Sequence, residues 1–76
     1  MIDTNNLGKK IAEVRRRSRL TQNDLAVKVG VTAQAVSKWE QGKSCPDIAI
    51  LDEIADALGI SLFELLGMDE RMESSS

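Results

Sequence analysis

Residues 22–41, QNDLAVKVGVTAQAVSKWEQ, have the spacing of two short helices that cross around a tight turn. Leu25 and Val29 lie one turn apart in the first segment, and Val36 and Trp39 share one face of the second. These four apolar side chains would meet between the two helices, and the pair would stay together by burying them.

The turn between the two segments has the residues that such a crossing needs. Gly30 follows the first helix, where a glycine takes the left-handed conformation at no steric cost, and Thr32 can cap the next helix with its hydroxyl. Ala26 is small enough to let the second helix approach closely. We therefore predict a helix-turn-helix, the unit that places a helix in a groove of DNA.

Composition indicates one small helical domain. A chain of 76 residues buries about 60% of its unfolded surface, and because aromatic residues make up only 3%, the core must be aliphatic. With no histidine and a single cysteine, Cys45, the chain has neither a Cys/His zinc site nor an internal disulfide. No apolar run approaches the roughly 20 residues of a membrane span. We expect a cytoplasmic protein without a cofactor or metal.

The charges are unevenly spread along the chain. Residues 1–43 contain nine Lys or Arg and four Asp or Glu (net +5), whereas residues 44–76 contain one Arg and eight acidic residues (net −7). The basic half contains the predicted helix-turn-helix, and the acidic half would point away from a polyanion. The net charge of −2 therefore does not exclude DNA as a partner.

Further helices are predicted on both sides of the central unit. Leu7, Ile11 and Val14 recur at helical spacing, and Asp47 and Ser61 can cap two later helices. The apolar face of the fourth helix would hold Ile48, Leu51, Ile54, Ala55 and Leu58. The five predicted helices span residues 6–18, 22–29, 33–41, 48–58 and 62–66. We expect the folded domain to cover residues 6–66 and residues 67–76 to be a disordered tail or linker.

The second helix of the central unit has a polar face opposite Val36 and Trp39. At 100° per residue this face carries Gln34, Lys38 and Gln41, flanked by Ala33 and Ser37, and it contains no acid. In a major groove, Gln can bond to adenine, Lys can bond to guanine, and an alanine methyl can touch a thymine methyl. The alternative is an ordinary solvated face, but the preceding turn and basic helix favour base reading.

Three segments of the sequence, LGKKIAEVRRRSRLTQNDLA, VGVTAQAVSKWEQGKSCP and LDEIADALGISLFELL, resemble the phage-repressor and Cro-like family of XRE-type helix-turn-helix regulators. Together they cover about residues 7–66. The resemblance implies an all-α fold, a five-helix lambda-repressor-like DNA-binding domain. It also implies a transcriptional regulator, a repressor, that binds double-stranded DNA in a sequence-specific way.

The resemblance also assigns roles to individual residues. It implies that Gln22 and Thr32, both at helix N-termini, and Lys43, just beyond the recognition helix, bind backbone phosphates; a helix N-terminus favours an anion on physical grounds as well. We add Gln41, at the end of the polar face, as a fourth phosphate-binding residue. The implied base-reading residues are Ala33, Gln34, Ser37 and Lys38.

Arg15 and Glu40 match a different role in the family, an ion pair between the first helix and the end of the recognition helix. We therefore exclude Arg15 from the DNA contacts. For Lys9, Arg16 and Arg17, we favour a solvated face that attracts DNA at long range. Arg19 stands where the family often has a glycine at the end of the first helix.

A recognition helix of this size reads only a few base pairs, so we expect a homodimer on a palindromic operator with half-sites about 34 Å apart. The hypothesised dimer interface is the fifth helix and the loop before it. Its residues are Ile60, Leu62, Phe63 and Leu66, and the alternative is that these side chains simply close the core.

Two other classes of function are weighed against DNA binding. The chain could be a protein-interaction module, such as an antitoxin or a regulator that binds a partner through its apolar back. An enzyme is disfavoured because the sequence has no histidine and no glycine-rich phosphate loop, and no paired acids that would mark a catalytic cleft.

Overall fold

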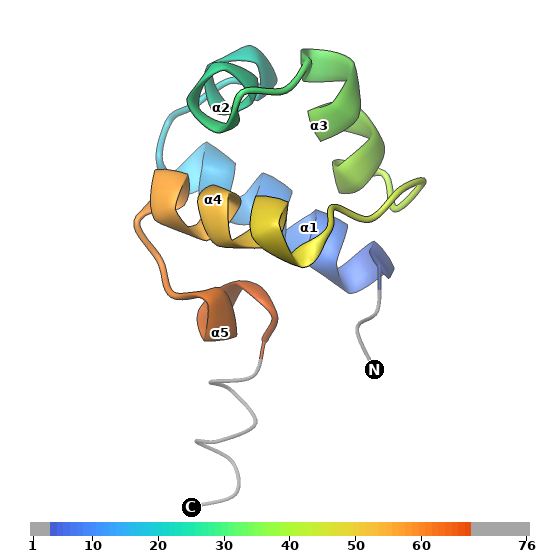
Figure 1. The fold of residues 1–76 in the computed structure, drawn as a ribbon. Coiled ribbons are helices and arrows are strands. Elements are labelled where there is room, and N and C mark those ends of the chain that lie inside the picture. The colour runs from blue at the N-terminus through green and yellow to red at the C-terminus, as the bar shows by residue number, and fades with distance from the viewer. Residues whose placement is uncertain (1–3, 68–76) are drawn as a thin grey trace, which may run out of the picture.

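The computed structural model describes residues 4–67 and has five helices within that range (Figure 1). They are α1 (Thr4–Arg17), α2 (Gln22–Val29), α3 (Ala33–Glu40), α4 (Ile48–Leu58) and α5 (Leu62–Leu65). Helices α2 and α3 form one end of the molecule, α1 and α4 lie in the middle, and α5 lies at the opposite end. Among these described residues, no helix has the length and apolar character that a membrane crossing requires. The predicted all-α fold is confirmed.

The core is built almost entirely from aliphatic side chains, and every helix contributes to it. Trp39 is the one aromatic side chain in it, with 7% of its surface exposed. The other buried apolar residues are Leu7, Ile11, Ala12, Val14, Leu25, Ala26, Val29, Val36, Leu51, Ile54, Ala55, Leu58 and Leu65. The predicted inward positions of the helix-turn-helix, including Ala26, are therefore all buried.

Local capping fixes where α2 begins and ends. The Thr21 hydroxyl accepts a hydrogen bond from the Asp24 N–H at 3.0 Å, and the Asp24 carboxylate accepts one from the Thr21 N–H at 2.9 Å. At the other end Gly30 has φ of 82°, in the left-handed region, and its N–H donates to the Ala26 carbonyl. The chain can therefore leave α2 sharply and begin α3 three residues later.

A glycine in α1 lets that helix touch the end of α3. A Cβ atom added at Gly8 would overlap the carbonyl oxygen of Trp39 and crowd that of Glu40. Because both obstacles are backbone atoms, a side chain at Gly8 would push the two helices apart. The contact at Gly8 was not predicted from the sequence, because it depends on how α1 and α3 cross.

Arg19 adopts the left-handed conformation, with φ of 59°, in the connection between α1 and α2. Its N–H donates to the Arg16 carbonyl, and the next N–H, of Leu20, donates to the Arg15 carbonyl. Arg19 stands where the family that the sequence resembles often has a glycine. The turn therefore keeps the geometry suited to glycine although the residue is an arginine.

Most helix boundaries agree with the predictions within two residues, and one predicted face needs correction. Helix α1 begins at Thr4 rather than at residue 6, while α3 and α5 each end one residue earlier than predicted. Ile48 was placed on the buried face of α4, but 64% of its surface is exposed. Helical periodicity marks a face of a helix but not where its neighbours end. Of the predicted tail, residues 68–76 lie outside the described range.

The Arg19→Gly variant should unfold at a higher temperature than the parent. A non-glycine residue in the left-handed conformation destabilises the fold by about 1–2 kcal/mol, and replacing Arg19 with glycine removes this penalty. Glycine also has more conformational freedom in the unfolded chain, which offsets part of the stabilisation. We expect a net stabilisation of about 0.5–1 kcal/mol, measured by thermal or urea unfolding. The Arg19→Ala variant removes the same charge but keeps the strain, so an equal gain there would contradict this explanation.

Candidate nucleic-acid interface

Helix α3 has a buried side and an exposed polar side. Val36 is fully buried and Trp39 nearly so, whereas Gln34 and Lys38 are exposed. Ala33 and Ser37 are half-buried at the edges of the polar side, and Gln41, directly after the helix, is exposed. The structure thus brings the predicted base-reading residues together on one accessible surface, and Figure 1 shows α3 at the outer end of the molecule.

The chemistry of this surface suits the major groove of duplex DNA. The amide of Gln34 offers donors and an acceptor, and the Lys38 ammonium offers donors only. The Gln41 Nε2 donates to the Ser37 hydroxyl oxygen at 2.7 Å, so these two side chains act together. Groups of this kind can distinguish base edges by hydrogen bonding.

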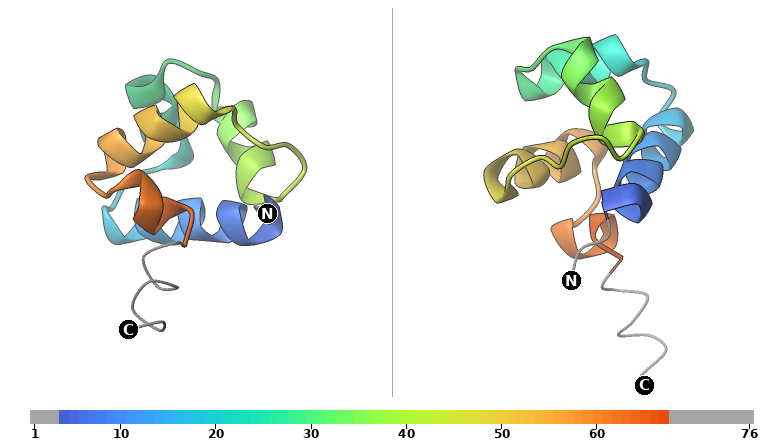
Figure 2. Two further views of the ribbon diagram at one scale, coloured as in Figure 1. Left: turned by 60° about the horizontal axis from the view of Figure 1, so that its bottom comes forward. Right: turned by 90° about the vertical axis from the view of Figure 1, so that its right-hand side faces the viewer.

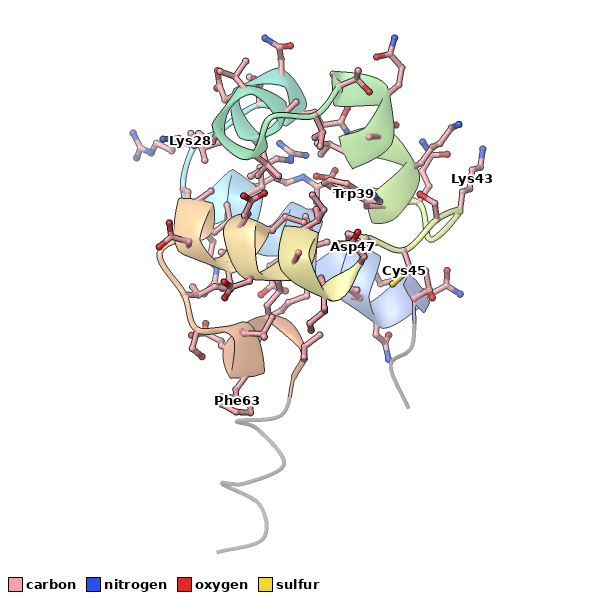
Figure 3. The ribbon with its side chains drawn as sticks, in the orientation of Figure 1. Lys28, Trp39, Lys43, Cys45, Asp47 and Phe63 are labelled. Atoms are coloured by element: carbon pink, nitrogen blue, oxygen red, sulfur yellow. The ribbon has the colours of Figure 1, made fainter. Side chains whose placement is uncertain are left out.

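The predicted phosphate-binding residues border this surface. Thr32 caps α3, because its hydroxyl accepts from the Ala35 N–H at 3.1 Å, and Gln22 is the first residue of α2. Lys43 is exposed in the loop after α3 and points away from the body of the molecule (Figure 3). Both helix N-termini and the lysine therefore offer partners for anions next to the polar face of α3.

A buried charge cluster joins α1 to the end of α3. Arg15 donates from Nε to Glu40 Oε2 at 2.6 Å and from Nη2 to Glu40 Oε1 at 3.0 Å. The third contact, from Arg15 Nη1 to the Leu20 carbonyl, is 2.8 Å long. The side chains of Arg15 and Glu40 are only 10% and 6% exposed. The structure thus contains the ion pair that the family resemblance implies.

The cluster has a third member that the sequence analysis missed. Gln22 Nε2 donates to Glu40 Oε1 at 3.0 Å, which ties the start of α2 to the end of α3. Because an amide nitrogen has two hydrogens, the second one stays available for an outside acceptor. Residue spacing gave no sign of this bond, since Gln22 and Glu40 are 18 residues apart.

The cluster keeps Glu40 charged. Burial raises the pKa of the Glu40 carboxyl, but the hydrogen bonds from Arg15 and Gln22 and the charges of Arg15 and Arg16 outweigh it, so the pKa lies below its ordinary value. The hydrogen bond to Glu40 in turn raises the pKa of Arg15. The pair is therefore fully ionised at neutral pH.

The predicted dimer residues lie at the other end of the molecule from this surface. Figure 3 shows Phe63 on α5, far from α2 and α3, and 59% of its surface is exposed. Ile60, Leu62 and Leu66 are half-buried and pack against the core. Among residues 4–67, no group of three or more metal-ligating side chains is present.

Glu40→Gln should destabilise the protein in a pH-dependent way. At neutral pH it leaves the buried Arg15 without its counter-charge, which costs about 3 kcal/mol. Because the folded-state pKa of Glu40 is lowered, its contribution is complete above the ordinary glutamate pKa of about 4.3 and is lost as pH falls through the lowered value. Urea unfolding from pH 7 to pH 3 should show the two proteins converging in acid. The exposed Glu53→Gln is the control, and a constant difference for Glu40→Gln would refute the charge explanation.

The sequence matches the helix-turn-helix family over residues 11–65. It is 35% identical over 57 residues to multiprotein-bridging factor 1 of Debaryomyces hansenii, an alignment that covers 75% of this chain and 38% of that protein. It is 37% identical over 60 residues to the uncharacterized HTH-type transcriptional regulator y4dJ of Sinorhizobium fredii, covering 79% of this chain and 78% of that protein. The chain thus spans little more than a third of the bridging factor but most of the bacterial regulator.

A solved structure has the same fold. The P22 c2 repressor protein, determined in complex with a synthetic operator, superposes with a TM-score of 0.77 and 31% sequence identity. The match covers 82% of this chain and 94% of that one. Because the family match extends over most of the residues and the P22 c2 repressor protein shares the fold, this chain belongs to the helix-turn-helix family of DNA-binding transcriptional regulators.

Proposed function

We propose that this chain is a cytoplasmic repressor that binds a palindromic operator as a homodimer, with residues 6–66 as its DNA-binding domain. The observation that carries the proposal is the division of α3, whose apolar side is buried while Gln34 and Lys38 remain exposed. If α3 served only to close the core, any polar or charged residues would suffice on its exposed side. That side instead combines amide, hydroxyl and ammonium groups with no acidic residue. The proposed activity is binding, without a catalytic step.

The base contacts would come from four side chains of α3. Gln34 can bond bidentately to adenine N6 and N7, and Lys38 can donate to guanine O6 and N7. The Ala33 methyl group can touch a thymine methyl, and the Ser37 hydroxyl can bond to several base edges. Each good contact is worth about 1–3 kcal/mol of discrimination, so the four together define a short half-site.

The phosphate contacts would fix the register of α3 on the duplex. Gln22 and Thr32 supply the two helix N-termini, and Gln41 and Lys43 lie at the other end of α3. Such contacts add affinity for any sequence. The hydrogen bond from Gln22 to Glu40 would hold the Gln22 amide in place before DNA arrives.

Two half-sites would require two copies of the chain. The proposed interface is the surface around α5, where Phe63 is exposed and its neighbours in sequence, Ile60, Leu62 and Leu66, are half-buried. An exposed phenylalanine beside other apolar atoms gains by being covered. Because α5 and α3 lie at opposite ends of the molecule (Figure 1), two subunits that meet at α5 must be tilted toward each other for both α3 helices to face one duplex. The distance between the two half-sites therefore tests this arrangement.

A second candidate function is a protein-binding module. The similarity to a protein named multiprotein-bridging factor 1 favours it, since that name describes a link between proteins. An antitoxin or another partner-binding regulator would use the same apolar surface around Phe63. Binding that falls steeply with salt indicates DNA, whereas salt-insensitive binding indicates an apolar protein contact.

Gln34→Ala should relax base preference at one position of each half-site. The loss of a bidentate contact removes about 1–3 kcal/mol of discrimination there and leaves the other positions unchanged. Lys43→Gln, by contrast, should weaken binding to all sequences alike and reduce the salt slope by about 1. The measurement is fluorescence anisotropy with the operator and its single-base variants. Equal losses on operator and random DNA for both variants would refute the assignment of roles.

Phe63→Glu should convert the dimer to a monomer. A carboxylate placed in an apolar interface would be desolvated without a partner, which costs more than the contact supplies. Sedimentation velocity beside the parent measures the change, and Asp52→Asn on the exposed side of α4 is the control. If the parent sediments as a dimer and Phe63→Glu sediments identically, the interface lies elsewhere.

A further inference from the structure

A groove with a volume of about 670 Å³ lies beside the polar face of α3, on the outer side of α1. Helix α1 forms one wall, and the start of α2 and the end of α3 form the other. The charged and polar side chains that line it are Lys9, Glu13, Arg16, Arg17, Gln22, Glu40 and Gln41. None of the proposed base-reading or dimer residues lines this groove.

The groove carries two exposed cations, Lys9 and Arg16, besides the paired Arg17. Arg17 is paired with Glu13 at 3.7 Å, and both side chains are well exposed. Lys9 and Arg16 make no hydrogen bond or ion pair with another residue in the range 4–67, and both are exposed. Arg16 and Glu40, the last residue of α3, both line the groove, and the Arg16 charge contributes to the lowered pKa of Glu40. Glu40 also borders the groove, but Arg15 neutralises it.

The spacing of the two cations suits the backbone of a nucleic acid strand. Lys9 and Arg16 are seven residues apart on one face of α1, about 10.5 Å along the helix. Successive phosphates of one strand lie farther apart than the axial rise of about 3.4 Å per base pair, because the strand winds around the duplex axis, so each of the two cations can meet a different phosphate of one strand. The small, buried Ala12 also lines the groove, and its side chain takes up little of the space between the two cations.

The groove is also continuous with the surface proposed for DNA. Gln22 and Gln41, two of its lining residues, are two of the four proposed phosphate ligands. A strand that passes these two amides would enter the groove next. An acidic protein segment could also bind these cations. The position of the groove next to the proposed phosphate ligands favours the DNA backbone over such a segment.

We propose that this groove binds the sugar-phosphate backbone of the duplex that flanks the half-site, with Lys9 and Arg16 as its phosphate ligands. The inference rests on the proposed DNA-binding function and extends it, because it assigns contacts to base pairs that α3 never reads. Glu13 acts against these contacts, since it repels phosphate and holds Arg17. The stretch of duplex that the protein contacts is therefore longer than the stretch whose bases α3 reads.

The test compares two operator duplexes, one that ends at the outer edges of the half-sites and one extended by ten base pairs of random sequence on each side. The parent should bind the extended duplex more tightly and with a steeper dependence on salt. Arg16→Gln and Lys9→Gln should each reduce the salt slope on the extended duplex by about 0.9, with no change on the short one. Glu13→Gln should raise affinity for the extended duplex only, a gain that misfolding cannot produce.

Lys28→Gln is the matched control, because it removes one exposed cation on the side of the molecule opposite Lys43 (Figure 3). It should leave the advantage of the extended duplex unchanged. The proposal is overturned if the extended duplex has no advantage for the parent, or if Arg16→Gln and Lys28→Gln behave alike. An unchanged length advantage in Arg16→Gln, with polyglutamate binding that is lost in this variant, would also overturn it and assign the groove to an acidic protein segment. If the short duplex is not bound in preference to random DNA, the proposed function fails and this inference with it.

Discussion

The position of α3 depends on the contact between Arg15 and Glu40. Helix α3 has eight residues, too few to be stable alone, so its neighbours must determine where it lies. Glu40 places a negative charge at the C-terminal end of α3, where the helix dipole disfavours it, and the Arg15 guanidinium offsets that charge. Gly8 brings the backbones of α1 and α3 together at the same place. One junction therefore fixes the distance between these helices and their relative rotation.

The same junction has an electrostatic consequence for the surface of the molecule. Glu40 is the one acidic residue of α3, and it lines the same groove as Gln22 and Gln41. Without Arg15, its carboxylate would repel a phosphate there. Because Arg15 neutralises it from within, the surface from Lys9 to Lys43 keeps a net positive charge. Figure 2 shows that α4 and α5, which carry the acidic second half of the described chain, lie away from the outer side of α2 and α3. The fold thus separates charges that the sequence separates only along its length.

Local features were predicted well, because each depends on neighbours in sequence. The left-handed Gly30, the Thr32 cap and the buried positions Val36 and Trp39 all follow from helical period and capping chemistry. The hydrogen bond from Gln22 to Glu40 and the role of Gly8 were not predicted, since both depend on how separate helices cross. The exposure of Ile48 was missed for a related reason: a periodic pattern gives the direction of a side chain but not the extent of the surface that it meets.

We infer that the exposed polar side of α3 reads bases, and that the contact with α1 fixes the orientation of α3. Selection of bound sequences from a pool of random duplexes, carried out with the whole chain, tests it most directly. The account predicts enrichment of an inverted repeat whose half-sites are centred about 34 Å apart, one helical turn of DNA. Recovered sequences that match the composition of the starting pool would contradict it.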